Sequence, residues 1–288
     1  MKELEASVGT TADIKSGVQI SKVHSRYFSS KKNAKAFCEV GIKPILSKLP
    51  KQIKLVDIGG GEGFLTKHVE KYLTKNGFQV DAYVLDANKY YLEKAKSCGL
   101  KTILSSIQNS NITDADLIIA RAFIHYNSKN NQQKLMNKIF SSLKTGGFFV
   151  HQMSSGSKEN CKIRSDIVNL KSLGRAVANQ QYNWISENEC LEMMNKAGFK
   201  ENIVAGYAPN NSWSPQEQWE RFNKKRFDEA KESHVKTLLK KRITFLSQAN
   251  NFIEKYITKY KNKDIKKLDE STYLIEYTYP ILIGRKSI

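Results

Sequence analysis

A cluster of glycines directly after a short apolar stretch limits what this chain can fold into. Leu55, Val56 and Ile58 lead into the glycines at 59, 60, 61 and 63, and an amphipathic stretch begins at Phe64. This order predicts a buried strand, a tight turn and a helix. Glycine has no Cβ, so a ligand can lie against the backbone of such a turn. The free N–H groups of the helix start would then face a polar ligand.

The spacing of the glycines distinguishes two kinds of nucleotide-binding turn. A dinucleotide-binding turn needs Gly-x-Gly-x-x-Gly, which would require glycine where Phe64 stands. The chain instead has Asp57, Gly59, Gly61 and Gly63 in the order acid-x-Gly-x-Gly-x-Gly. This motif resembles the first motif of class I S-adenosyl-L-methionine-dependent methyltransferases and implies that these four residues bind that cofactor. The alternative is a glycine-rich turn without a ligand.

A second acidic residue ends the next predicted strand. Asp86 follows the strand 80–85 and lies 23 residues beyond Gly63. A carboxylate at the end of a parallel strand can accept hydrogen bonds from the two ribose hydroxyls. The resemblance implies this role for Asp86, with Ala87 beside it. The alternative is that Asp86 caps the helix that we expect from Tyr90 onward.

Two further segments extend the resemblance. Ser106 and Ile107 follow a short predicted strand, 101–104, and fall where the family contacts adenine, although the aspartate common at this position is missing. The predicted strand 115–120 runs into Arg121, which the resemblance assigns to the cofactor site, and then into an apolar segment containing His125. Base-directed amino methyltransferases carry Asn-Pro-Pro-Tyr or Asp-Pro-Pro-Tyr here. Its absence argues against methylation of an exocyclic base amine.

The remaining matches place a helix at 135–143, glycines at 146 and 147 and a strand at 148–153, so the resemblance covers residues 55–153 in the expected order. Methyl transfer is an in-line displacement, and a general base is needed only when the acceptor must lose a proton. His125 is the first candidate for that base because it follows a strand at the carboxyl-end rim of the sheet. Five residues are candidates to line the acceptor pocket, and plain packing is the alternative for each: Tyr27, Tyr126, His151, Tyr182 and Trp184.

The resemblance implies an α/β fold: a doubly wound, mostly parallel seven-stranded sheet with helices on both faces and one antiparallel strand. We expect an N-terminal helical cap at 1–50, a Rossmann-like cofactor-binding core at 51–210, and the final strand within 268–288. Between the core and the final strand, the sequence predicts a helical insertion at 211–267, which would be either a lid or an oligomer interface. Its long apolar stripe must bury one face, against its own domain or in a homodimer. Pro280 within the last strand favours an edge or a bulge.

The amino-acid composition indicates the environment in which this protein works. Of the 288 residues, 40% are hydrophobic, but no apolar run approaches the roughly 20 residues of a membrane span. The first residues lack the apolar stretch of a signal peptide, and four scattered cysteines indicate neither a disulfide framework nor a metal site. We therefore expect a cytoplasmic protein. The net charge of +19 is densest in 211–267, which carries 15 basic and 7 acidic residues.

These features predict a methyltransferase that acts on the O or N nucleophile of a small-molecule acceptor. Two alternatives stay open. An RNA methyltransferase would use the basic helical segments to hold phosphate groups. A non-catalytic protein would have kept the S-adenosyl-L-methionine pocket for binding or interaction alone.

Overall fold

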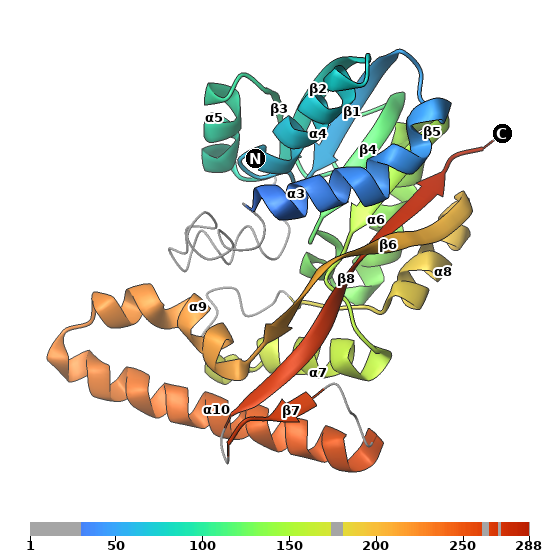
Figure 1. Ribbon diagram of the computed structural model, residues 1–288. Coiled ribbons are helices and arrows are strands. Elements are labelled where there is room, and N and C mark those ends of the chain that lie inside the picture. The colour runs from blue at the N-terminus through green and yellow to red at the C-terminus, as the bar shows by residue number, and fades with distance from the viewer. Residues whose placement is uncertain (1–29, 174–180, 261–264, 270–271, 288) are drawn as a thin grey trace.

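The computed structural model describes residues 30–173, 181–260, 265–269 and 272–287, and these residues form one α/β sheet with helices on both faces (Figure 1). Eight strands form the sheet, in the order β3-β2-β1-β4-β5-β8-β6, with β7 paired to β8 off this path. Their bounds are Gln52–Ile58 (β1), Gln79–Asp86 (β2), Lys101–Leu104 (β3), Ala115–Arg121 (β4), Leu143–Gln152 (β5), Lys200–Trp213 (β6), Ile265–Lys267 (β7) and Tyr273–Arg285 (β8).

The strand directions confirm the predicted doubly wound sheet. β1 to β5 pair in parallel, whereas β8 runs antiparallel to both β5 and β6. Seven strands lie on the main path, as expected. The additional strand is the three-residue β7, which pairs with Tyr273–Ile275 of β8.

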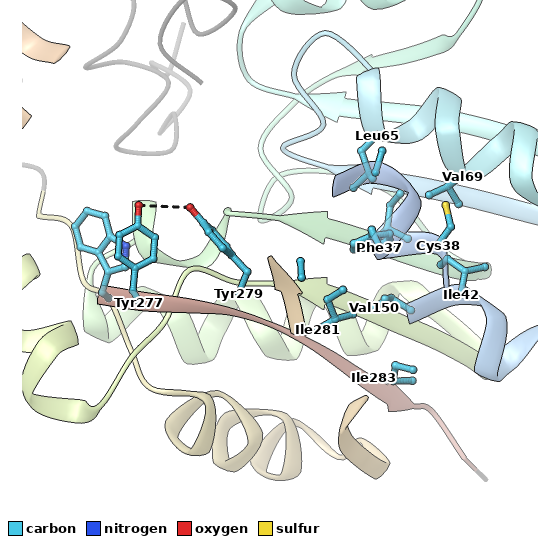
Figure 2. Close-up of a cluster of buried hydrophobic side chains, with 14 of the residues drawn as sticks. Phe37, Cys38, Ile42, Leu65, Val69, Val150, Tyr277, Tyr279, Ile281 and Ile283 are labelled. Carbon is cyan, nitrogen blue, oxygen red and sulfur yellow. Dashed lines mark hydrogen bonds between the residues drawn. The ribbon is translucent and has the colours of Figure 1, made fainter. Parts of the chain in front are cut away.

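Alternating side chains along the strands build two apolar layers. Leu55 of β1 points into a cluster with the N-terminal helices and α4, whereas Val56 points into a cluster with α6 and α8. Figure 2 shows the first cluster, in which Phe37 and Ile42 lie over β5 and β8. The helices are α3 (Lys31–Phe37), α4 (Phe64–Lys75), α5 (Lys89–Ser97), α6 (Lys129–Ser142), α7 (Lys158–Val168), α8 (Glu187–Ala197), α9 (Pro215–Asp228) and α10 (Glu232–Tyr260), with short π or 3₁₀ turns at Cys38–Ile42, Lys43–Lys48, Ile124–Tyr126 and Lys171–Leu173.

Helices α9 and α10 lie between β6 and β8 in the chain, in the segment for which the sequence predicts a helical insertion. β6 and β8 extend beyond the parallel strands and carry α9, α10 and β7 at their far end (Figure 1). Phe245, Ala249 and Ile253 are the fully buried residues of α10. The predicted stripe is not buried along its whole length, because Leu239 is 41% exposed and Ile243 is 67% exposed.

α7 begins at Lys158, where the Ser157 side chain caps it by accepting a hydrogen bond from the Asn160 N–H. Pro280 does not lie on an edge strand, since β8 runs between β5 and β6, but it pairs with Tyr207 between two irregularities of the β6 ladder, at Val204/Gly206 and Ala208/Asn211, in agreement with the predicted bulge. Its missing N–H is tolerated because the ladder with β5 ends one residue away, at Gln152↔Ile281. Within the described ranges, no helix has both the length and the apolarity to cross a bilayer.

Candidate functional site

The glycine turn between β1 and α4 is held in a conformation that glycine favours. Gly59, Gly61 and Gly63 have φ angles of 65°, 56° and 79°, in the left-handed region. A Cβ on Gly59 would lie 2.4 Å from the Phe123 ring, so this position is closed by packing. A Cβ on Gly61 would meet nothing within 4 Å. The turn is therefore packed on one side and open at Gly61, where a ligand can approach the backbone.

Asp86 lies beside the open part of this turn. Its Oδ2 accepts a hydrogen bond from the Gly61 N–H at 3.0 Å, and its Oδ1 accepts one from the Asn88 N–H at 2.8 Å. Burial raises the pKa of Asp86 to about 6, although these backbone hydrogen bonds favour the charged form. The cap of α5 is Asn88, whose side chain accepts from the Tyr90 N–H. The alternative capping role for Asp86 is therefore filled by another residue.

Asp57 supports the turn from inside the protein. It is 1% exposed, and its Oδ2 accepts a hydrogen bond from the Thr66 hydroxyl at 2.7 Å. A Cβ on Gly60 would lie 2.8 Å from the Asp57 carboxyl carbon, so the turn packs directly on this side chain. Burial raises the pKa of Asp57 to about 7, against the opposing effects of the Thr66 hydrogen bond and the Arg121 charge.

The other predicted cofactor residues surround the same turn and the end of β2. The Ser105 N–H donates to the Asp86 carbonyl oxygen at 3.1 Å, which places the following Ser106 and Ile107 next to Asp86. Ile107 is 1% exposed and packs in the cluster beneath the sheet, while the Ser106 hydroxyl accepts from the Asn109 N–H. Ala87 and Arg121 are half-buried.

This arrangement fits a ribose-containing cofactor. Each carboxylate oxygen can accept more than one hydrogen bond, so Asp86 retains acceptor sites for sugar hydroxyls after bonding Gly61 and Asn88. The open face of Gly61 leaves space for the ligand beside that carboxylate.

Four predicted site residues come together in one cluster of aromatic rings. The His125 ring stacks on Trp184, with centroids 4.6 Å apart and planes at 17°. Tyr126 lies 4.3 Å from His125, and Tyr182 lies 5.4 Å from both Tyr126 and Trp184. These residues come from two segments more than 50 positions apart in the sequence. We refer to His125, Tyr126, Tyr182 and Trp184 as the ring cluster.

A buried amide that the sequence did not reveal fixes the ring cluster. Gln132, on α6, is 1% exposed, and its Nε2 donates to the carbonyl oxygens of Ile124, Asn127 and Asn183. Its Oε1 accepts from the Asn183 side chain at 2.9 Å, and the Asn183 N–H donates to the His125 carbonyl oxygen at 3.0 Å. Gln132 therefore joins the two segments that carry the rings.

His151 is not brought to the ring cluster. It lies on β5 facing α8, with its ring stacked 5.6 Å from Phe149 and its Nδ1 3.9 Å from Cys190 Sγ. Burial lowers the pKa of His151 to about 3, so the ring is neutral. The remaining pocket candidate, Tyr27, lies outside the described residues.

Two more residues of the site region carry no sequence signal of their own. Phe123 covers Gly59, but in the sequence it is one apolar residue among several after β4. Arg164 stands on the polar helix α7, yet its side chain is buried beside Trp184. Only the three-dimensional contacts distinguish these two residues from their neighbours.

Comparison with known proteins agrees with this geometry. The family model described as "Methyltransferase domain" matches residues 30–203, and no curated protein matches the sequence. Solved structures share the fold: a candidate methyltransferase from Bacillus halodurans C-125 (15% identity, TM-score 0.59, covering 88% of this chain and 99% of that one) and the YcgJ protein from Bacillus subtilis (14% identity, TM-score 0.58, covering 86% and 98%). A third is Haemonchus contortus phosphoethanolamine N-methyltransferase 2 with phosphomonomethylethanolamine and S-adenosylhomocysteine (12% identity, TM-score 0.53, covering 100% and 59%). With the family match extending over the glycine turn, Asp86 and the ring cluster, the chain belongs to the methyltransferase domain family and is an S-adenosyl-L-methionine-dependent methyltransferase.

Proposed function

We propose that this enzyme methylates an O or N nucleophile of a small-molecule acceptor that binds against the ring cluster. One observation carries the proposal: His125 follows Phe123 by two residues, and the Phe123 ring packs on Gly59 of the cofactor turn. The rings therefore stand next to the turn at which the cofactor would bind. Aromatic walls suit a small acceptor, because such pockets combine apolar surfaces with a few polar groups.

The cofactor-side roles follow from the contacts around the turn. Asp86 would accept hydrogen bonds from the ribose hydroxyls, and the open backbone at Gly61 would lie along the ligand. Asp57 would act indirectly, by holding Gly60 and Thr66 in place. The remaining walls of the cofactor site would be formed by Ala87, Ser106, Ile107 and Arg121. When bound, S-adenosyl-L-methionine supplies the electrophilic methyl group.

On the acceptor side, the protein would mainly position the nucleophile and exclude water. His125 is 6% exposed and Trp184 is 5% exposed, so an acceptor that binds against these rings would be largely dehydrated. If the acceptor is a phenol or an ammonium group, the His125 imidazole would accept its proton. A carboxylate acceptor would need no base.

The test is to supply the purified protein with S-adenosyl-L-methionine and measure S-adenosylhomocysteine release. Phenols, carboxylic acids and primary amines would be compared with structured RNA. We expect turnover with at least one class of small acceptor. Cofactor binding with methylation of RNA alone would contradict the proposal, and binding without any turnover would favour a non-catalytic role.

RNA is a second candidate for the methyl acceptor because of one structural feature. Lys236, Lys240 and Lys241 are exposed in the first part of α10, close to its connection with α9. If these residues hold phosphates, RNA affinity will fall steeply with salt, by roughly one logarithmic unit per contact for each tenfold rise in concentration. A flat salt response would remove this candidate.

A further inference from the structure

Arg164 of α7 is a buried cation without an acidic partner in the described part of the chain. Arg164 is 9% exposed, and its Nη1 donates a hydrogen bond to the Ser154 hydroxyl at 2.6 Å. Its Nε is buried and has no hydrogen-bond partner among the described residues. No aspartate or glutamate of the described ranges forms an ion pair with it. Burying a charge without a counter-charge is costly, so this arrangement requires an explanation.

Aromatic rings provide part of the compensation. The Arg164 guanidinium lies 4.4 Å from the Trp184 ring centroid and 4.2 Å from that of Tyr277, and Trp213 is 5.8 Å away. Figure 2 shows Tyr277 beside Tyr279, with their hydroxyls directed toward each other. A guanidinium between aromatic faces gains from cation–π contacts. These contacts hold the Arg164 guanidinium in position, but among the described residues they leave its charge without a counter-ion.

The position of Arg164 connects it with the ring cluster. Trp184 contacts both groups: the His125 ring stacks on it at 4.6 Å, and the Arg164 guanidinium lies over it at 4.4 Å. The indole therefore connects the predicted methyl-transfer region with a fixed positive charge.

We propose that Arg164 binds an oxyanion, a carboxylate or a phosphate group, carried by the acceptor molecule. This inference rests on the proposed function and narrows its substrate class to anionic small molecules. A fixed guanidinium is suited to this task because its planar N–H groups match the oxygens of such anions. Ser154, held on Nη1, keeps the guanidinium from rotating and supplies a second polar group at the same place.

Calorimetry on the full chain loaded with S-adenosylhomocysteine tests the inference. The probes are benzoate and phenyl phosphate, with benzamide as the neutral match. We expect one or both anions to bind at least about tenfold more tightly than benzamide, as charge-assisted hydrogen bonds predict. The stronger of the two anions identifies the oxyanion as a carboxylate or a phosphate.

Substitution then assigns the binding to this residue. Arg164→Gln should lower the affinity for the preferred anion about 10- to 100-fold and leave benzamide unaffected. Lys162→Gln is the matched control, because Lys162 lies on the same helix but pairs with Asp166 with its side chain 61% exposed. This control should bind the anion as the unaltered protein does. Should the glutamine variant fail to fold, Arg164→Lys, which keeps the charge but loses the planar fork, should weaken anion binding at least fivefold.

Three results would overturn the inference: benzamide binding as tightly as the anions, no binding of either anion, or unchanged anion affinity in a folded Arg164 variant. The proposed function would survive each of them if a neutral small molecule were methylated. It would fall separately if no small acceptor of any charge gave turnover while the cofactor bound.

Discussion

The Gly61 N–H donates a hydrogen bond to the Asp86 carboxylate at 3.0 Å, which joins the turn after β1 to the end of β2. This contact orients the carboxylate beside the open face of Gly61 without using all of its acceptor sites. The cofactor turn and the residue proposed to hold the ribose thus form one unit, and changes to either should affect cofactor affinity.

Replacing Asp86 by alanine should weaken S-adenosylhomocysteine binding by about 10- to 100-fold, because hydrogen bonds to a charged acceptor contribute about 1.5–3 kcal/mol each. Calorimetry measures this directly. Asp81→Ala is the control, since Asp81 lies on the same strand but pairs with Lys101 at the surface. Equal affinities for the Asp86 variant and the unaltered protein would contradict the ribose assignment.

Asp57 should make the stability of the protein depend on pH. Burial raises its pKa to about 7 in the folded state, whereas an unfolded aspartate has a pKa of about 3.9. Between these values the folded state retains a proton that the unfolded state has lost. The contribution of Asp57 to the free energy of unfolding therefore decreases as pH rises from about 4 to about 7, by roughly 4 kcal/mol.

The measurement compares urea unfolding of the protein and of Asp57→Asn at several pH values. Asparagine can still accept the Thr66 hydrogen bond but does not titrate. Relative to the unaltered protein, the variant should gain stability as pH rises through this window. A constant difference between the two proteins from pH 4 to pH 8 would show that Asp57 is ionised throughout.

Asp57 and Asp86 show which parts of the site can be predicted from the sequence. Asp57, the glycines and Asp86 belong to short contiguous patterns, and local patterns of that kind predict strand, turn and helix well. The sequence also identified three of the four rings as pocket candidates and His125 as the candidate base, although it could not show that they touch. Arg164 and Gln132 could not be found in this way, because their surroundings come from distant segments: Trp184 and Tyr277 for Arg164, and Asn183 for Gln132.

Gln132→Leu should disturb the ring cluster as well as the stability of the fold. The substitution leaves the carbonyl oxygens of Ile124, Asn127 and Asn183 without this donor, and we expect a loss of about 1–3 kcal/mol in the free energy of unfolding. The acceptor KM should rise more than the cofactor Kd. Gln133→Leu, at the next position of α6, is the control. A cofactor Kd that changes as much as the acceptor KM would indicate a general structural role.

His125→Phe separates base catalysis from packing, because phenylalanine keeps a ring against Trp184 but cannot accept a proton. With a phenol or ammonium acceptor, kcat should fall by roughly 10²–10⁴-fold while the acceptor KM stays within a few-fold. With a carboxylate acceptor, kcat should change little. Turnover of a phenol equal to that of the unaltered enzyme at every pH would exclude His125 as the base.

The exposed part of α10 allows a test of the predicted homodimer. Leu239 and Ile243 stand four residues apart on one helix face and are 41% and 67% exposed, so a second chain could cover them. If it does, Ile243→Asp should convert a dimer into a monomer in analytical ultracentrifugation, because an unpaired carboxylate in an apolar interface is costly. The variant should keep its cofactor affinity, since Ile243 lies on α10 and not at the glycine turn before α4. Thr244→Asp, at the next position on the exposed surface, adds the same charge outside the Leu239–Ile243 face and is the matched control. An unaltered protein that sediments as a monomer at about 50 μM would contradict the dimer and leave the lid as the proposal for 211–267.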